Sequence, residues 1–386
     1  MDPTGDQQLV KRINRSLLLR LMRARPGLSR AQLAAGSGLT KSTVGVLVRE
    51  LMEQGWLSEA PAASSAEPGR PSTPLHINGR SRGLIGVEIA VEFLRVAGVS
   101  VLGEVVWSAE EPLTSTVPAA TCAQAARLAR RGQVALAALG MELSGLGVGL
   151  PGAFDGTTGR VLFAPNLGWR DLDFLPLIGH ALAKAGVAPV PLHVQNEADT
   201  AALSEYEFAS GGDEGALIFL TCDVGVGAGI VLNDRLFTGV HGMAGEIGHS
   251  ILQVDGPVCS CGRRGCAEAF IGARAIARHT RELGHIRPAG RSLGVLLQNL
   301  WTTFNPGVLV VGGPSCIRHP ELVQTARETL QAYARDARMT PPEVRTARYG
   351  LLAAAVGAAA LVLHDYLRPM LPRARRSRST PALPAA

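Results

Sequence analysis

Long apolar runs are missing from this sequence of 386 residues. Glycine, proline or a charged residue interrupts every apolar stretch before it reaches the roughly 20 residues that span a bilayer. The first residues, MDPTGDQQLVKR, also lack the apolar segment of a secretory signal. We therefore expect a cytoplasmic protein with no membrane partner, whose cysteines are reduced and available for metal binding.

Lysine is also scarce, because it occurs only at positions 11, 41 and 184 and leaves arginine to supply most of the basic charge. The formal net charge is nevertheless +6, and the isoelectric point is about 9.3. A basic balance suits a nucleic-acid partner without requiring one. The length predicts two or three domains, and we find no internal sequence repeat and no heptad run.

The first 60 residues have the pattern of a winged helix-turn-helix. Apolar residues recur at helical spacing over 13–22, Ser29 is placed to cap a second short helix, and Thr40 a third that stops at Gly55. The N-terminal half of the third helix carries a basic, hydroxyl-rich face, as a recognition helix does in the major groove. The predicted DNA contacts there are Lys41, Ser42, Thr43, Gly45 and Arg49. The alternative is a three-helix bundle that binds protein.

A polar stretch rich in proline, alanine and serine follows, and we assign residues 61–82 to a wing and a linker. Within it, the short turn at residues 68–71 presents Arg70. A guanidinium on such an arm can enter a narrow minor groove, where the negative potential is greatest. We therefore add Arg70 to the predicted DNA contacts, with a plain linker turn as the alternative.

From Leu84 the pattern changes to buried strands and helices, which predicts an α/β domain. Three successive strands open it as a meander, and a helix is expected over residues 119–139. Two amides lie near strand ends, Asn166 on a loop and Asn196 directly after the strand at 190–194. Polar groups at the C-terminal ends of strands lie where α/β folds bind ligands.

Cysteine is rare, yet three of the six cysteines fall within eight positions. With one nearby histidine they form the set His249, Cys259, Cys261 and Cys266. One imidazole and three thiolates are a closed tetrahedral set, the usual ligation of a structural zinc. Glu246 and Glu268 flank this set, where carboxylates can accept hydrogen bonds from a polyhydroxylated ligand. The alternatives are four unconnected residues and two solvated acids.

Several motifs together resemble the ROK family (repressor, open reading frame, kinase). They are the winged helix with its Gly-Arg-Pro turn, the loops LPG (150–152) and PNLGW (165–169), the segment NEADTAAL (196–203), and AGEIGH (244–249) followed by CSCGRRGCAE (259–268). The resemblance covers nearly the whole chain, and the last motif is highly specific. It implies an α/β fold of the actin-like, ribonuclease H-like type found in sugar kinases, with two lobes, a sugar held between them, and a structural zinc knot.

On this resemblance we divide the chain into a winged helix-turn-helix (1–60), a wing and linker (61–82), a ROK domain (83–370) and a disordered basic tail (371–386). The ROK domain would comprise lobes at 83–195 and 196–350, with a C-terminal helix at 350–367 packing back. The resemblance implies sugar contacts at Asn166, Asn196, Glu246, His249 and Glu268, with Glu197 beside them at the kinase general-base position. His249 would serve both zinc and sugar.

Kinases of this family bind ATP phosphates on two glycine-rich turns. Here the first turn, Glu88–Glu92, has neither glycine, and the second, Asp223–Gly227, begins with a carboxylate and lacks a hydroxyl. Without glycine the backbone cannot approach a phosphate, and a carboxylate repels it. Glu197 stands where the general base is usually Asp, and its extra methylene moves the carboxylate by about 1 Å, which can cost about a hundredfold in rate. We therefore expect no catalytic residue and no enzyme activity.

These observations predict a sugar-responsive transcriptional repressor. Its heads would bind a palindromic DNA operator as a homodimer or homotetramer, with zinc as a structural cofactor and a sugar as the effector. The alternatives are an active sugar kinase with an appended DNA-binding head, a regulator that answers to a partner protein or another metabolite, and an activator.

Overall fold

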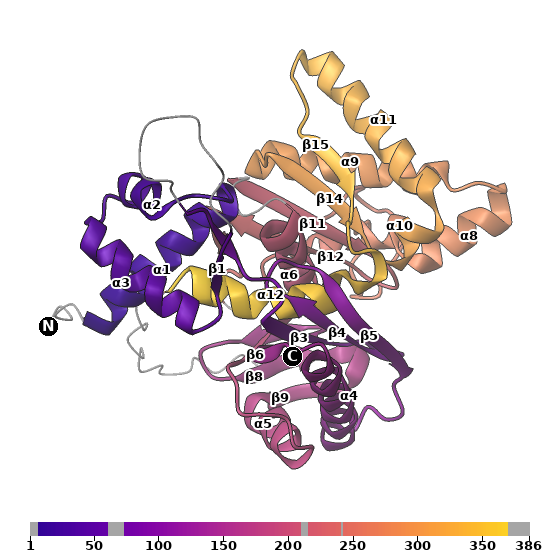
Figure 1. The fold of residues 1–386 in the computed structure, drawn as a ribbon. Helices are drawn as coiled ribbons and strands as arrows, with labels where there is room; N and C mark the ends of the chain where they lie inside the picture. The colour runs from indigo at the N-terminus through magenta and orange to yellow at the C-terminus, as the bar shows by residue number, and fades with distance from the viewer. Residues whose placement is uncertain (1–6, 61–72, 210–214, 241, 370–386) are drawn as a thin grey trace, which may run out of the picture.

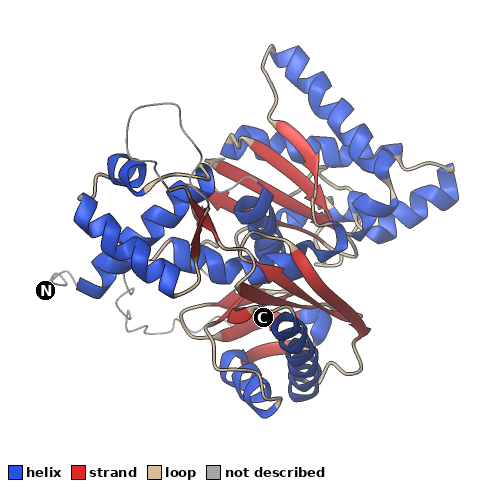
Figure 2. Ribbon diagram, in the orientation of Figure 1, coloured by secondary structure: helices blue, strands red, loops and turns tan. Residues whose placement is uncertain are grey.

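The computed structural model describes residues 7–60, 73–209, 215–240 and 242–369. In Figure 1 the chain begins in an indigo head of helices, continues through a sheet drawn in purple and a second sheet drawn in red to orange, and ends in a helix drawn in yellow. Figure 2 shows helices flanking both sheets and a further layer of helices between them. Arg70, most of the predicted linker and the predicted tail at 371–386 lie outside the described residues.

The head is a helix-turn-helix with a two-stranded wing. Its elements are α1 (Gln7–Ala24), α2 (Arg30–Ser37), α3 (Lys41–Glu53), β1 (Leu57–Glu59) and β2 (Leu75–Ile77), with the two strands antiparallel. Ser29 forms a capping box with Gln32, and the Thr40 hydroxyl accepts a hydrogen bond of 3.2 Å from the N–H of Thr43. Both predicted caps are confirmed. The first helix starts earlier than the expected residue 13.

The first large sheet has the strand order β10-β6-β3-β4-β5. Its strands are β3 (Arg82–Ile89), β4 (Phe93–Ser100), β5 (Val105–Pro112), β6 (Glu142–Leu150) and β10 (Leu192–Asn196). The first three form the predicted antiparallel meander, and β6 and β10 add in parallel. Helices α4 (Pro118–Ala138) and α5 (Phe174–Lys184) pack on one face. Because helices cover both faces of the central strands, β3 and β4 are buried along almost their whole length.

A small antiparallel sheet is inserted between β6 and α5. It consists of β7 (Ala153–Asp155), β8 (Arg160–Ala164) and β9 (Trp169–Asp173). A single turn of 3-10 helix, Pro165–Leu167, joins β8 to β9 and carries Asn166.

The second large sheet repeats the topology of the first. Its order is β13-β12-β11-β14-β15, built from β11 (Ala216–Cys222), β12 (Val226–Leu232), β13 (Arg235–Leu236), β14 (Val308–Gly312) and β15 (Glu343–Thr346). Again three antiparallel strands are followed by two parallel ones. Helices α9 (Arg287–Phe304) and α11 (Pro320–Ala337) cover its outer face, and α7 (Glu268–Ile271), α8 (Ala273–Leu283) and α10 (Pro314–Arg318) lie around them.

Two helices form the layer between the sheets. α6 (Glu197–Leu203) packs on β11 and β12, α12 (Ala353–Leu367) packs on β3 and β6, and the two helices pack on each other. Glycine makes this close approach possible. A Cβ at Gly357 would lie 1.6 Å from the carbonyl oxygen of Thr200, and one at Gly86 would lie 1.8 Å from that of Ala355. The helix Gly350–Leu367 is long and apolar enough to cross a membrane, but α12 is a core helix of this fold.

The head shares its apolar core with this central layer. Leu18, Met22 and Leu51 of the head belong to the same buried cluster as Val356 and Leu363 of α12. Figure 1 shows the yellow α12 running from the indigo head into the space between the two sheets. The head is therefore packed on the body by an apolar contact as well as joined to it through the chain.

The crossing of α6 and α12 predicts that Gly357→Ala destabilises the protein. The added methyl group would overlap the backbone of Thr200, so the helices would have to separate, at a cost of about 3 kcal/mol in the free energy of unfolding. Urea denaturation measures this change. The matched control is Gly179→Ala in the interior of α5, where a Cβ meets open space and alanine should stabilise by up to about 1 kcal/mol. Equal midpoints for Gly357→Ala and the wild type would contradict the packing described.

Candidate functional site

The four predicted metal ligands come together. The ligand atoms of His249, Cys259, Cys261 and Cys266 all lie within 4.8 Å of one another. The Sγ atoms of Cys261 and Cys266 are 3.7 Å apart, and Sγ of Cys259 is 3.7 Å from Nδ1 of His249. Zinc bonds of about 2.3 Å to sulfur place two sulfurs of a tetrahedron about 3.8 Å apart. The spacing and the donor set therefore fit a tetrahedral metal ion, and all three cysteines are free thiols.

The environment of the thiols also suits a metal ion. Cys261 is exposed, and the guanidinium of Arg263, with Nε 3.4 Å from its sulfur, lowers the pKa of this thiol to about 6. Cys266 is fully buried, and burial raises the pKa of its thiol to about 12. A thiolate at Cys266 therefore needs a cation beside it, which a bound metal ion supplies.

The metal-ligand loop also positions Glu268. Its Oε1 accepts a hydrogen bond of 2.5 Å from the Ser260 hydroxyl and lies 3.7 Å from Sγ of Cys259. Its other carboxylate oxygen, Oε2, faces Gly225 of the second turn, where an added Cβ would lie 3.4 Å from it. Glu246 directly precedes the short helix that carries His249, and it remains exposed. Although the residue as a whole is exposed, partial desolvation of its carboxyl group raises the pKa of Glu246; the charge of Glu268 adds to this shift, and His249 opposes it.

Asn196 ends β10 and caps α6. Its Oδ1 accepts hydrogen bonds from the N–H groups of Ala198 (2.7 Å) and Asp199 (3.4 Å), and its Nδ2 donates to the carbonyl of Gly152 (2.9 Å). The amide predicted to bind a sugar therefore already links the helix to the Leu-Pro-Gly loop. Because both lone pairs of Oδ1 are already engaged, a ligand can be bound by the remaining N–H of the amide.

Two acids of α6 resist ionisation. Burial, and then the charges of Glu88, Asp223 and Glu246, raise the pKa of Glu197 to about 8. Burial and Glu246 raise the pKa of Asp199 well above its usual range. Oδ1 of Asp199 is also buried without a hydrogen-bond partner among the described residues. Both carboxyl groups are therefore shifted toward their protonated forms.

The two turns that the resemblance matches to phosphate turns, Glu88–Glu92 and Asp223–Gly227, each contribute an acid to an ion pair. Glu88 is buried 3.0 Å from Arg95, which also binds Glu110 (2.7 Å) and donates to the carbonyl of Leu351 (2.6 Å). Burial raises the pKa of Glu88 to about 7, although Arg95 opposes the shift. In the second turn, Asp223 lies 3.5 Å from Arg318. The sequence pattern did not predict a role for Arg95 or Arg318. The local signal for Arg95 was a charged residue inside the otherwise apolar strand β4.

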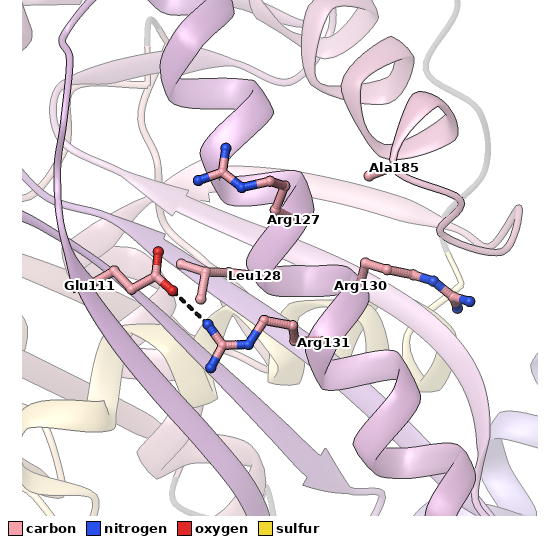
Figure 3. Close-up of a pocket in the computed structure, with 6 residues that line it drawn as sticks. All are labelled: Glu111, Arg127, Leu128, Arg130, Arg131 and Ala185. Atoms are coloured by element: carbon pink, nitrogen blue, oxygen red, sulfur yellow. Dashed lines mark hydrogen bonds and ion pairs between the residues drawn. The ribbon is translucent and has the colours of Figure 1, made fainter.

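Asn166 is not joined to this group. It is exposed on its turn, and no hydrogen bond or ion pair connects it to the other predicted ligand residues in the described part of the chain. A hollow of about 340 Å³ lies beside the same turn, against Leu167 and Trp169. Figure 3 shows a second hollow of about 340 Å³ on α4, where Arg131 pairs with Glu111 and Arg130 points away from both. Neither hollow contains the carboxylates described above.

The predicted recognition face is accessible on α3. Lys41, Ser42 and Arg49 are exposed, whereas Thr43 and Gly45 are half-buried. The hydroxyls of Ser42 and Thr43 lie within 2.9 Å of the capping hydroxyl of Thr40, so they already have a partner. Val46, which is 51% exposed, lies on the same face and was missed. An apolar group at this position can contact a thymine methyl in the major groove.

Comparison with known proteins identifies the family. Residues 116–287 and 284–365 match the model of the ROK family, and residues 16–61 match the IclR helix-turn-helix domain. The ROK matches span more than half of the chain. The chain therefore belongs to the ROK family. The predicted α/β fold, with its helix-turn-helix head and two mixed sheets of the ROK sugar-kinase type, is confirmed.

ROK proteins of two kinds resemble this chain. The xylose repressor of Bacillus subtilis is 27% identical over 384 residues, which cover 94% of this chain and 98% of that protein. The glucokinase of Streptomyces coelicolor is 34% identical over 175 residues, which cover 45% of this chain and 53% of that protein. The full-length similarity and the head make this chain a ROK-family transcriptional regulator, and the kinase similarity is confined to part of it.

Two solved ROK structures share the fold. A ROK family transcriptional regulator, a homolog of the E. coli MLC protein, aligns with a TM-score of 0.74 over 93% of this chain and 98% of that one, at 23% identity. A ROK family glucokinase from Streptomyces griseus, in complex with glucose and AMPPNP, aligns with a TM-score of 0.61 over 72% of this chain and 98% of that one, at 24% identity.

The metal site predicts that Cys261→Ser releases the metal ion. Because Cys261 is exposed, the substitution removes one ligand and disturbs little packing. We expect the metal content, measured by plasma mass spectrometry, to fall from about one zinc per chain to near zero. Arg264→Ala, at an exposed position of the same loop, should keep its zinc. Full metal content in Cys261→Ser would contradict the ligand assignment.

The raised pKa of Glu197 predicts a pH-dependent stability effect. The unfolded carboxyl ionises near pH 4.5 and the folded one near pH 8, so this group lowers wild-type stability progressively as pH rises between these values. Glu197→Gln should match the wild type near pH 4.5 and be more stable by about 2 kcal/mol at pH 7.5. Urea denaturation at both pH values measures the difference. The exposed Glu104→Gln controls for the loss of one charge, and a pH-independent difference for Glu197→Gln would be the contrary result.

Proposed function

We propose that this chain is a repressor whose ROK domain binds a free sugar as its effector. The observation that carries this proposal is the arrangement at the metal-ligand loop, where Glu246 lies near Glu197 and Asp199 at the start of α6 and Glu268 lies near Glu246. Carboxylates and amides satisfy paired hydroxyl groups. A zinc ion held by His249 and the three cysteines would fix this loop and take no part in chemistry.

The charges at the two turns support binding of a neutral sugar without ATP. Glu88 and Asp223 occupy the places where kinases of the family bind phosphate, and each has its own arginine within the protein. Glu197, at the general-base position, has a pKa raised to about 8, and in its protonated form it cannot accept a proton. The carboxylates of Glu246 and Glu268 at the metal-ligand loop would repel a sugar phosphate, so the free sugar should bind more tightly than its phosphate. The resemblance to xylose repressors suggests a pentose or hexose.

The head would read operator DNA through α3. Lys41 and Arg49 supply contacts to phosphates or base edges, Ser42, Thr43, Gly45 and Val46 complete the face, and Arg70 would reach the minor groove. Two heads in a homodimer or homotetramer would bind palindromic half-sites about one helical turn apart, in the cytoplasm. Repression ends if the sugar binds the DNA-free conformation more tightly than the DNA-bound one.

Operator binding in the presence of sugars tests this function. We expect a panel of free pentoses and hexoses to include one that weakens operator binding in a mobility-shift titration, while its phosphate has little effect. Arg49→Ala should weaken operator binding by about 1–3 kcal/mol because it removes a groove contact. Arg170→Ala, an exposed arginine of β9 in the body, is the control and should bind like the wild type.

Other outcomes of the same experiment identify the alternatives. Sugar-dependent release of ADP would make the chain a kinase with a DNA-binding head. If the protein binds its operator normally and no sugar changes that binding, it is a regulator that responds to another signal. Unchanged binding by Arg49→Ala would contradict the recognition face.

A further inference from the structure

One of the contacts between the head and the body is a buried carboxylate with several charged partners. Glu207 has no exposed side-chain surface, and its carboxylate lies 2.5 Å from Arg23 of α1 and 2.7 Å from Nδ1 of His364 in α12. Arg368, just beyond α12, also pairs with it, and Arg23 donates a further hydrogen bond to the carbonyl oxygen of Glu207. Burial alone would raise the pKa of Glu207, but His364, Arg23 and Arg368 together lower it to about 2. Glu207 therefore connects the head, α12 and its own helix.

The helix that carries Glu207 begins at the candidate ligand site. α6 is capped by Asn196 and starts with Glu197, and it continues without a break into the π-helical turn Ser204–Ala209. At 1.5 Å per residue, Glu197 and Glu207 are about 15 Å apart along the axis. Single π-helical turns within α-helices are frequent at functional sites. One continuous helix thus reaches from the ligand site to the head.

A second contact fixes the head on α12. The rings of Trp56 and Tyr366 stack at 4.6 Å with an interplanar angle of 8°, and the guanidinium of Arg82 lies 5.2 Å from the centre of the Trp56 ring. Because α12 and α6 touch through their backbones at Gly357 and Thr200, a movement of α6 cannot be absorbed between them. The head therefore contacts α12 and the extension of α6, and Glu207 in that extension binds both Arg23 of the head and His364 of α12.

We propose that Glu207 is the positioning residue that couples effector binding to the orientation of the DNA-binding head. This inference rests on the proposed function. A ligand bound by the first residues of α6 shifts that helix along or about its axis, and the Glu207–Arg23 pair transmits the shift to α1. A buried ion pair suits this task because its geometry is specific and a displaced partner leaves a charge unpaired. In an oligomer, reorienting each head changes the spacing of the recognition helices.

Arg23→Gln removes the guanidinium that the head contributes to the ion pair and leaves Glu207 paired with His364 and Arg368. We expect this variant to bind the sugar with wild-type affinity by calorimetry and still to bind the operator. The change in operator affinity caused by the sugar, which for coupled sites is typically about 5–150-fold, should fall below about threefold. Hydrogen exchange should show a sugar-dependent change in α1 of the wild type that is lost in the variant.

The matched control is Arg20→Gln, one turn earlier on α1. Arg20 also pairs with an acid of the body, Asp234 at 3.3 Å, but both side chains are at least 40% exposed. An exposed pair contributes little, so this variant should keep the full sugar response. Glu207→Gln, which alters the link from the other side, should lose the response as Arg23→Gln does. If Arg23→Gln does not fold, Arg23→Lys, which keeps the charge without the two-pronged geometry, should show a reduced response.

The outcomes separate this inference from the proposed function. A wild type that responds to sugar together with an Arg23→Gln or Arg23→Lys variant that responds equally overturns the role of Glu207 and leaves the proposed function intact. Equal loss of response in Arg20→Gln also overturns it, because the effect would then belong to the whole interface. A wild type whose operator affinity no sugar changes overturns both.

Discussion

The structure depends on the close crossing of α6 and α12. Their backbones touch at Thr200 and Gly357, and α12 touches β3 through Gly86 in the same way. Because no side chain separates these elements, neither helix can move without moving what packs on it. The candidate ligand residues lie at one end of α6, and the contact with the head lies at the end of its π-helical extension. The crossing therefore fixes the relative positions of the two sheets, the ligand site and the head.

Buried and paired charges are the second feature that determines the properties of the candidate ligand site. In the ROK fold the two turns near the start of α6 are where a nucleotide would be expected, yet here they carry Glu88 and Asp223, each paired with an arginine of the chain. Burial and nearby carboxylates, which are Glu88, Asp223 and Glu246 for Glu197 and Glu246 for Asp199, drive both acids toward their neutral forms. Under the proposed function, such a site would favour the hydroxyl groups of a sugar over phosphates. The metal-ligand loop adds Glu246 and Glu268 from another direction, on a segment that a bound ion would hold rigid.

Some features were predictable because their signals are local in the chain. Ser29 and Thr40 precede apolar runs as caps do, and both cap their helices. The metal ligands were predictable because cysteine is rare and its spacing carries chemical meaning. Asn196 was correctly placed at a strand end, but its second role as a helix cap appeared only with the contacts. Arg95 and Glu207 were missed, since an isolated charge in an apolar segment does not reveal its partner.

The repeat of the two sheets was also invisible in the sequence. Both sheets have three antiparallel strands followed by two parallel ones, yet no sequence repeat accompanies them, because a strand order constrains burial and hardly constrains residue identity. The sequence alone determined the elements, the caps, the metal ligands and the family resemblance, all of which depend on residues near one another in the chain. Only the tertiary structure decided which charges are paired, which acids keep their protons and how the head meets the body. These depend on groups up to several hundred residues apart, whose partners and desolvation are set by packing.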